Sequence, residues 1–300
     1  MKLIVSGGTG FIGTRVVDRF KRDEHYVAVY SRRPGKEQRT GIASYFWDPL
    51  GAPPSEDSLD GMDAVIHLAG ETVAQRWNPA VKARIRDSRV LATRNLVAAI
   101  GRTRNRPKTL VCASAIGIYG ERGDEVLTEK STPGSGFLVD VCRGWEVEAD
   151  MALKYGIRVV KLRIGFVLGL DGGALKEMLP PFRLGLGGRL GFSGRQWMPW
   201  IHIDDLCAMI QRATLDASVS GVWNCTAPNP VRNRDFTGEL GQALHRPAIF
   251  PVPGMALKLL FGEFGQHMLD SARVLPEAAV KAGFQFQYPE IGPALRNLVG

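Results

Sequence analysis

The sequence has no long uninterrupted apolar run, and it contains few cysteines and histidines. A membrane-spanning helix needs about 20 apolar residues, so we expect neither such a helix nor a membrane partner. The four cysteines lie far apart in apolar stretches without a C-x-x-C pair, which predicts reduced, packed thiols. The five histidines show no metal-ligand spacing, so no metal site is expected. Met1 runs almost directly into apolar Leu3–Val5, which leaves no room for a signal peptide in this sequence. These features favour the cytoplasm, with an organelle matrix as the alternative.

Positive charge is not spread evenly along the chain. The formal net charge is +8, and the segment from Arg76 to Lys108 alone holds ten basic residues and one acidic residue. Nucleic-acid binding requires a broader basic stripe or a recognisable module, so we expect no nucleic-acid partner. The basic segment suits an anionic small ligand or a solvated helix face. A homodimer is compatible with the sequence.

Short apolar runs alternate with helical patterns over the first two-thirds of the chain. The runs predicted as strands are Leu3–Ser6, Tyr26–Tyr30, Ala64–Leu68, Leu110–Ser114 and Arg158–Leu162. The segments predicted as helices are Phe11–Arg22, Pro79–Ile100 and Phe137–Tyr155. The strands are apolar on both faces, as in a parallel sheet covered by helices. The pattern therefore predicts an α/β fold with a Rossmann-like, doubly wound parallel sheet.

The composition of the sequence changes after about Leu170, where glycine and proline become frequent. The strand-like Val222–Cys225 and a helix starting near Ile203 indicate a return to the main sheet. We therefore expect a nucleotide-binding domain over 1–170, to which the chain returns near 198–226. A smaller substrate-side lobe is expected from 171–197 and 227–300.

The strongest local signal is a glycine-rich turn between the first strand and the first helix. It reads Gly7-Gly8-Thr9-Gly10-Phe11-Ile12-Gly13. Glycine permits a sharp turn and a close approach of the backbone to a pyrophosphate, and the helix N-terminus offers free amides. The pattern therefore predicts dinucleotide binding by Gly7, Thr9, Gly10, Phe11, Ile12 and Gly13.

The residues after the second strand set the cofactor preference. An NAD site would place an acidic residue there, but the chain reads Tyr30-Ser31-Arg32-Arg33. A hydroxyl and two guanidinium groups suit a 2′-phosphate, so Ser31, Arg32 and Arg33 predict NADP(H). Small residues end a later strand, and we expect Leu68, Ala69 and Gly70 to approach the adenosine ribose. His67, inside that apolar run, is interpreted as a packed core residue.

Several motifs together resemble the short-chain dehydrogenase/reductase superfamily in its extended or atypical branch. They are Gly7-x-x-Gly10-x-x-Gly13, Leu68-Ala69-Gly70, Ser114-x-x-x-x-Tyr119-Gly120, Arg163-x-Gly165-x-Val167-Leu168-Gly169 and Trp200-Ile201-His202-Ile203-Asp204-Asp205. The segments Arg76-Trp77, Ser88-Arg89 and Pro181–Gly188 are similar to the epimerase-family, or sugar-nucleotide-epimerase-like, subgroup, which has its own C-terminal domain. The resemblance spans essentially the whole chain.

The resemblance implies further cofactor contacts. Members of the extended branch commonly carry Asn where this chain has Arg89, and an arginine there could reach the phosphate or carboxamide of the cofactor. Arg84 lies five residues earlier, so only one of the two is expected to face the cleft squarely. The loop that includes Val167 should place backbone near the nicotinamide.

The chain departs from the superfamily at its catalytic positions. The usual Tyr-x-x-x-Lys is missing: depending on register, the Tyr position is Leu138 or Val139 and the Lys position is Cys142 or Arg143. The usual Ser/Thr position aligns best with Ala115. The remaining catalytic candidates are Ser114 and Tyr119, although an aromatic residue before Gly120 is commonly a packing residue.

Other polar residues have two interpretations each. Cys142 would be a nucleophile only with a lowered pKa and is otherwise inert. His202 with Asp204 and Asp205 resembles a catalytic pair, but an aspartate that caps the next helix and a histidine that braces a turn explain them better. Residues near the cleft that suit either an anionic substrate or a solvated loop are Arg183, Arg189, Arg195, Trp197 and Trp200.

Two functions fit this sequence. The first is an NADP(H)-binding oxidoreductase or epimerase-like enzyme that acts on a small, anionic substrate with unusual acid–base residues. The second is a catalytically degenerate NADP(H)-binding scaffold or redox sensor.

Overall fold

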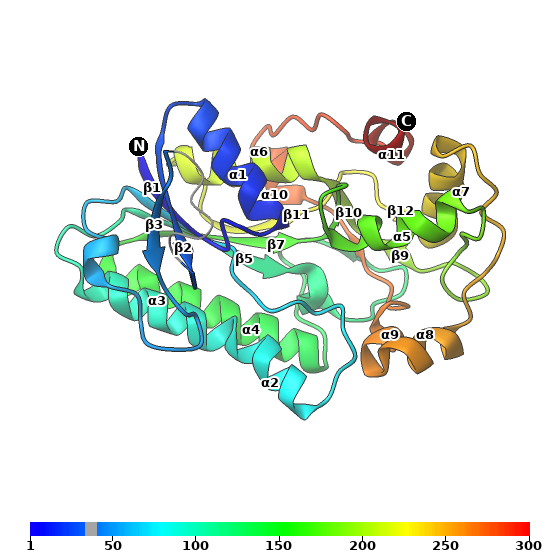
Figure 1. The fold of residues 1–300 in the computed structure, drawn as a ribbon, viewed down its shortest axis with the longest axis horizontal. Coiled ribbons are helices and arrows are strands. Elements are labelled where there is room, and N and C mark those ends of the chain that lie inside the picture. Colours follow the sequence, from blue (N-terminus) through cyan, green and yellow to red (C-terminus); the bar gives the residue numbers. More distant parts are fainter. Residues whose placement is uncertain (34–40) are drawn as a thin grey trace.

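The computed structural model describes residues 1–33 and 41–300. Its centre is a seven-stranded sheet with the order β11-β7-β5-β4-β1-β2-β3, in which all neighbouring strands are parallel (Figure 1). The strands are β1 (Lys2–Ser6), β2 (Tyr26–Ser31), β3 (Ala43–Phe46), β4 (Ala64–His67), β5 (Thr109–Ala115), β7 (Arg158–Ile164) and β11 (Gly221–Cys225). The chain crosses from β1 to β2 on one side and to β4 on the other, which confirms the doubly wound Rossmann-like fold.

Helices cover both faces of the sheet. On one face lie α1 (Phe11–Arg22) and α6 (Ile203–Leu215), and on the other lie α3 (Val90–Arg102) and α4 (Phe137–Asp150) (Figure 1). The inner strands have two buried faces, because neighbouring side chains point to opposite sides of the sheet and helices cover both sides. Leu3 and Val5 thus pack in the core beneath α1 and α6, while Ile4 packs with residues of α3 and α4.

The predicted helix Pro79–Ile100 is wrong as a single element. The structure has α2 (Pro79–Asp87) and then α3, which starts at Val90. Between them, the Ser88 hydroxyl donates to the Ile85 carbonyl (3.2 Å) and accepts from the Glu71 amide (2.9 Å). These side-chain bonds compete with the helical backbone pattern. The apolar spacing continues across the break, so periodicity alone could not locate it. The predicted helix Phe137–Tyr155 likewise changes, after α4, to the 3₁₀ turn η3 (Met151–Tyr155).

The other elements gather mainly at the carboxyl ends of the strands. Three two-stranded pairs are β6 (Val126–Leu127) with β13 (Arg273–Val274), β8 (Phe166–Leu168) with β10 (Trp200–His202), and β9 (Trp197–Met198) with β12 (Val231–Arg232). The remaining helices and 3₁₀ turns are α5 (Gly173–Arg183), α7 (Asn233–Ala243), α8 (Gly254–Phe261), α9 (Glu263–His267), α10 (Glu277–Lys281), α11 (Ile291–Val299), η1 (Glu56–Ser58) and η2 (Ile116–Tyr119). A separate core of Phe182, Trp200, Phe236 and Leu295 holds α5, α7 and α11 together.

After α5 the chain returns to the main sheet through α6 and β11. A later segment also contacts this sheet, because Ala279 of α10 and Phe284 pack into the core beneath α1 and α6. On the opposite side, Lys82 of α2 forms an ion pair with Glu263 of α9 (2.6 Å), and Trp77 packs against Phe264. The basic segment Arg76–Lys108 therefore contacts α9, which comes after the last strand of the main sheet in the sequence. Among residues 1–33 and 41–300, no helix combines the length and apolar character required to cross a membrane.

Candidate functional site

A cleft of about 600 Å³ lies at the carboxyl ends of β1, β2 and β4. This is the edge at which open α/β sheets bind ligands. Of the residues predicted to bind a cofactor, eight line it: Gly7, Thr9, Gly10, Ser31, Arg32, Arg33, Ala69 and Gly70. Three separate parts of the sequence therefore meet around one cavity.

The glycine-rich turn leaves no space for side chains. Gly7 has φ of +70°, and a Cβ there would lie 2.9 Å from the Ala69 nitrogen. A Cβ on Gly13 would lie 2.0 Å from the Gly7 carbonyl oxygen. Within the described residues, no side chain caps α1 and no acidic residue occupies its first turn. The first amides of α1 therefore remain available to an anion, as a pyrophosphate cradle requires.

Phe11 and Ile12 lie differently from the glycines. The Phe11 ring packs against the loop before α5: a Cβ on Gly169 or Gly172 would come within 2.6 or 2.8 Å of it. Ile12 is partly buried and packs against the core beneath α1 and α6. The side chains of both residues therefore serve packing, and their backbone amides belong to the helix N-terminus.

The end of β2 carries positive charge into the cleft. The Ser31 hydroxyl accepts a hydrogen bond from the Arg33 amide (3.0 Å), which fixes the turn after the strand. Arg32 and Arg33 are exposed, and across 1–33 and 41–300 neither forms an ion pair with a carboxylate. Two guanidinium groups are thus free to bind an anionic group.

One wall of the cleft was not predicted from the sequence. It follows β3 and consists of Trp47, Asp48, Pro49 and Leu50. The Trp47 ring meets the Tyr30 ring edge to face at 5.1 Å, and its indole nitrogen donates to the Ala52 carbonyl (3.2 Å). β3 is a short, half-exposed edge strand, so it lacked the apolar signal of the other strands. The aromatic run Tyr45-Phe46-Trp47 was the one cue to it.

A buried histidine supports the turn from below. As predicted, His67 is a packed core residue, with no exposed surface. Its Nδ1 lies 2.5 Å from the Ser6 hydroxyl and its Nε2 lies 3.1 Å from the Thr93 hydroxyl. The same Ser6 hydroxyl accepts from the Ala69 amide (3.3 Å). Burial lowers the pKa of His67 to about 4, so the ring is neutral at physiological pH.

This histidine makes the stability depend on pH. Above about pH 6.5 the folded and unfolded chains both hold a neutral His67, whereas between about pH 6.5 and 4 only the unfolded chain takes up a proton. We therefore expect His67 to lower the free energy of unfolding by up to about 3 kcal/mol over this fall in pH. Urea denaturation at a series of pH values measures it, and the His67→Gln variant should lose this part of the slope. An unchanged slope in the variant would contradict the assignment.

Arg84 and Arg89 are placed differently. Arg84 is half-exposed, with its Nε 3.9 Å from a Glu71 oxygen. Arg89 turns inward: its Nη1 donates to the Ile85 carbonyl (3.1 Å) and its guanidinium stacks over the Trp145 ring at 5.3 Å. A Cβ on Gly70, a cleft residue, would lie 3.2 Å from the Arg89 Cζ. Burial lowers the pKa of Arg89. Neither arginine is among the described residues that line the cleft: Arg89 lies behind Gly70 and Arg84 beside Glu71, and both of these neighbours line it.

The structure decides the register of the missing Tyr-x-x-x-Lys. A Cβ on Gly117, just after β5, would lie 3.6 Å from the Leu138 Cβ and 3.9 Å from the Cys142 sulfur. Arg143 is exposed, and Val139 packs beside Gly120. The pair that faces the end of β5 is therefore Leu138 and Cys142. Burial raises the pKa of Cys142 to about 12, so its thiol is not a nucleophile at neutral pH.

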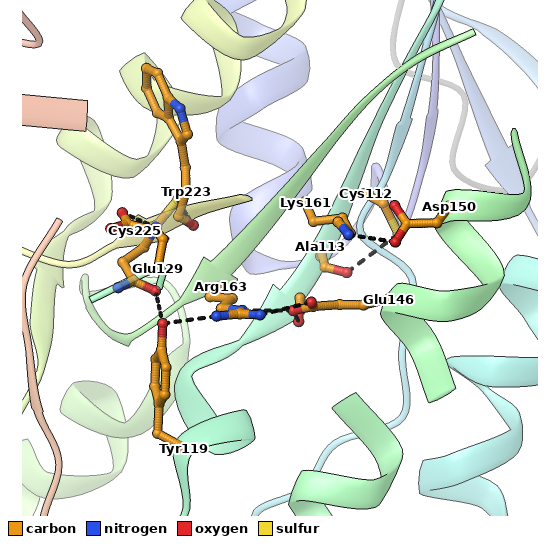
Figure 2. Close-up of polar contacts among 12 residues, drawn as sticks. Cys112, Ala113, Tyr119, Glu129, Glu146, Asp150, Lys161, Arg163, Trp223 and Cys225 are labelled. Carbon is orange, nitrogen blue, oxygen red and sulfur yellow. Dashed lines mark hydrogen bonds and ion pairs between the residues drawn. The ribbon is translucent and has the colours of Figure 1, made fainter. Parts of the chain in front are cut away.

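Ser114 and Tyr119 both belong to a buried polar network, of which Figure 2 shows Tyr119, Arg163 and Glu146. Ser114 Oγ donates to Glu146 Oε1 (2.7 Å), and Arg163 binds both Glu146 oxygens from Nε (2.8 Å) and Nη2 (2.9 Å). Arg163 Nη1 also donates to the Tyr119 hydroxyl (3.0 Å), which donates to Asn224 Oδ1 (2.7 Å). Burial raises the pKa of Tyr119. The geometry gives both residues a structural role, and a catalytic one stays a prediction.

His202 is not part of a catalytic pair. It is 1% exposed, stacks on the Tyr288 ring at 3.9 Å, and caps α6 by accepting from the Asp204 amide (3.1 Å). The cap is thus the histidine rather than an aspartate, which corrects the sequence-based interpretation. Asp205 instead accepts from the amides of Gln287 and Tyr288 (2.8 and 2.9 Å). Val167, on β8, pairs with Ile201 of β10 and packs against the core beneath α1 and α6.

The sequence matches two family models and several described proteins over most of its length. The model of the NAD dependent epimerase/dehydratase family matches residues 3–225, and a model described as a domain of unknown function matches residues 252–298. The epimerase family protein SDR39U1 homolog, chloroplastic, of Arabidopsis thaliana is 42% identical over 100% of this chain and 87% of its own length. The epimerase family protein YfhF of Bacillus subtilis is 37% identical over 100% of this chain and 98% of its own length.

A solved structure agrees with the fold over the whole length. The crystal structure of the human epimerase family protein SDR39U1 (isoform 2) with NADPH has a TM-score of 0.90 at 35% identity. The match covers 100% of this chain and 99% of that chain.

Proposed function

The chain belongs to the NAD dependent epimerase/dehydratase family, as an atypical short-chain dehydrogenase/reductase, and on this premise we propose that it is an NADP(H)-dependent oxidoreductase or epimerase-like enzyme. We propose a small, anionic substrate. The observation that carries the proposal is the cleft that joins the uncapped glycine turn to Arg32 and Arg33, neither of which pairs with a carboxylate of residues 1–33 or 41–300. The NADPH bound by the human relative supports the same cofactor here.

The residues of the cleft fit this cofactor from one end to the other. The first amides of α1 would hold the pyrophosphate, and Ser31, Arg32 and Arg33 would hold the 2′-phosphate. The wall from Trp47 to Leu50 would contact the adenine, since it adjoins the end of β2. Arg89, against Gly70, would carry positive charge towards the nicotinamide half. When bound, NADPH supplies a hydride at the nicotinamide.

Beside the end of β5, where the nicotinamide would lie, the protein's own residues would orient the reactants and supply positive charge. Leu138 and Cys142 provide an apolar surface beside the end of β5 and no group that exchanges a proton near neutral pH. Arg89 provides a permanent positive charge next to them. We propose that residues 171–197 and 227–300 form the substrate-side lobe that closes over this surface.

The alternative function is an NADP(H)-binding scaffold or redox sensor. It is favoured by the loss of the usual acid–base pair and by the burial of Ser114 and Tyr119 in a network. Loss of NADPH absorbance with a panel of aldehydes, ketones and nucleotide sugars separates the two. Turnover of any of them supports the enzyme, whereas tight NADPH binding without turnover supports the scaffold.

Removing the two arginines after β2 tests the cofactor assignment. In the double variant Arg32→Ala/Arg33→Ala, NADPH affinity should fall by about 10- to 100-fold, because a charge-assisted hydrogen bond is worth about 1.5–3 kcal/mol. NADH affinity should stay the same, since NADH lacks the 2′-phosphate. Fluorescence titration measures both ligands, and Arg104→Ala, an exposed arginine elsewhere, is the control. Equal loss of NADPH and NADH would contradict the assignment.

The cellular location and assembly complete the proposal. The four cysteines are all buried and free, which suits a reducing compartment such as the cytoplasm. The chloroplastic relative keeps an organelle matrix as the alternative. Besides the small-molecule substrate, the proposed partner is a second copy of the chain in a homodimer. Analytical sedimentation of the purified protein measures its mass in solution and tests this proposal.

A further inference from the structure

A tryptophan whose ring contacts two arginines lies outside the nucleotide cleft. The Trp197 ring of β9 has the guanidinium of Arg232 (β12) 4.5 Å from its centroid and that of Arg273 (β13) 4.8 Å from it. The Trp197 indole nitrogen donates to Asp124 (2.7 Å), and its backbone amide donates to the Ser271 hydroxyl (3.1 Å). Segments far apart in the sequence thus converge on one ring.

The two arginines of this stack differ in their partners. Arg232 donates to the Arg195 carbonyl (2.5 Å) and to Asp124 (3.0 Å). The side chain of Arg273 makes no hydrogen bond or ion pair with any residue of 1–33 or 41–300, and its Nε is buried without a partner. A buried polar group without a partner costs about 1–3 kcal/mol. A half-buried guanidinium held by stacking alone therefore needs an explanation beyond stability.

The carboxylates near this stack are already engaged. Asp124 accepts from Trp197 and Arg232. Glu121 accepts from the amides of Gly123 (2.9 Å) and Ser271. Neither forms an ion pair with Arg273, so the charge of Arg273 is not neutralised within the described part of the chain.

The group of Trp197, Arg232 and Arg273 lies close to the residues that follow the carboxyl end of β5, where the nicotinamide is expected. Ala272 and Val274, which flank Arg273, pack with Ile116 and Cys142 in the cluster that follows β5. On the other side, β9 leads directly into β10, which pairs with β8 and its Val167. Arg273 is therefore attached to both segments expected to surround the nicotinamide.

We propose that Arg273, whose guanidinium lies over the Trp197 ring, binds the anionic group of the substrate, either a phosphate or a carboxylate. This inference rests on the proposed function and assigns its substrate contact to one residue. The Nη atoms of a planar guanidinium can donate in parallel to two oxygens of such a group. Trp197 and Arg232, fixed through Asp124, hold the plane in place and act as positioning residues.

Binding of small anions to the NADPH-saturated protein tests the proposal. Saturation with NADPH first blocks the phosphate sites of the cleft, and failure to reach saturation would overturn the cofactor proposal separately. Isothermal titrations then use inorganic pyrophosphate in one arm and malonate in the other, at fixed ionic strength. We expect saturable binding in at least one arm, weakened at least ~10-fold in Arg273→Met, as expected for loss of a charge-assisted bond.

Two further variants make the outcome decisive. Arg195→Met removes an exposed arginine of the same cluster and should change the affinity less than ~2-fold, since it alters only the general field. Arg273→Lys keeps the charge but loses the planar donor pair, so intermediate binding is expected. It also serves if Arg273→Met does not fold. No saturable binding in either arm, or equal weakening by Arg195→Met and Arg273→Met, would overturn the proposal.

Discussion

Replacing Glu146 by glutamine is expected to lower the free energy of unfolding by about 3–5 kcal/mol, the usual cost of breaking a buried ion pair. The side chains of Glu146 and Arg163 are only 10% and 8% exposed, so water cannot replace the lost partner. Burial acts to lower the pKa of Arg163, but its bonds to Glu146 and Tyr119 outweigh burial and raise it. A guanidinium keeps its charge at neutral pH even without an acidic partner, so the charge of Arg163 persists when Glu146 is neutralised. Urea denaturation at neutral pH measures the change.

A neighbouring pair on the same two elements provides the control. Lys161 of β7 pairs with Asp150 of α4 (2.6 Å), two residues along the strand and four along the helix from the first pair (Figure 2). The Asp150 side chain is 41% exposed, although Lys161 is only 12% exposed, so Asp150→Asn should cost less than Glu146→Gln because water reaches one partner of this pair. The double variant Glu146→Leu/Arg163→Met should be more stable than the sum of its single variants, because neither charge is then left alone. A similar small loss for Glu146→Gln and Asp150→Asn would show that the buried pair is not important for stability.

Gly13→Ala is expected to abolish NADPH binding at micromolar concentrations, a loss of ~100-fold or more in affinity. The new methyl group would lie 2.0 Å from the Gly7 carbonyl oxygen and 2.8 Å from the Gly8 Cα, and both are backbone atoms of the turn. The backbone would have to move, and the amides at the start of α1 would then no longer converge on a phosphate. Fluorescence titration of NADPH measures the effect.

The control for this substitution is a glycine with space around it. A Cβ on Gly51 would approach no heavy atom closer than 3.5 Å, so Gly51→Ala should bind NADPH like the wild type. Gly8→Ala is an intermediate case, because its Cβ would meet the Val29 side chain at 2.6 Å rather than backbone. Additional truncation of Val29 to alanine should then restore part of the affinity. Normal NADPH binding by Gly13→Ala would refute the role given to the turn.

The sequence predicted those parts of the fold that have a strong local signal. Strands such as Leu3–Ser6 were visible because both of their faces are apolar, and the glycine turn was visible from its spacing. The break at Ser88 was not, because hydrogen bonds of one side chain end the helix while the apolar period continues. The strand β3 was also not predicted, because a half-exposed edge strand needs few apolar residues and so gives only a weak signal in the sequence.

The candidate site was predicted unevenly for the same reason. Ser31, Arg32 and Arg33 follow a strand whose end is easily located, so their place in the cleft could be predicted. The network of Ser114, Glu146 and Arg163 could not, because its members come from β5, α4 and β7 without a local pattern. Likewise, Trp197 was singled out as a residue for an anion, but its partners Arg232 and Arg273 become visible only when the chain is folded.

The strand order also constrains how the chain can be made. The four neighbouring strands β4, β1, β2 and β3 are complete before residue 70, whereas β11 joins the opposite edge only after residue 220. Contacts between distant residues form slowly, and amino-terminal segments leave the ribosome first. The nucleotide-binding half can therefore begin to assemble during translation, while β7 waits with an open edge for its last neighbour. In that interval the backbone N–H and C=O groups along one edge of β7 remain without their partners from β11.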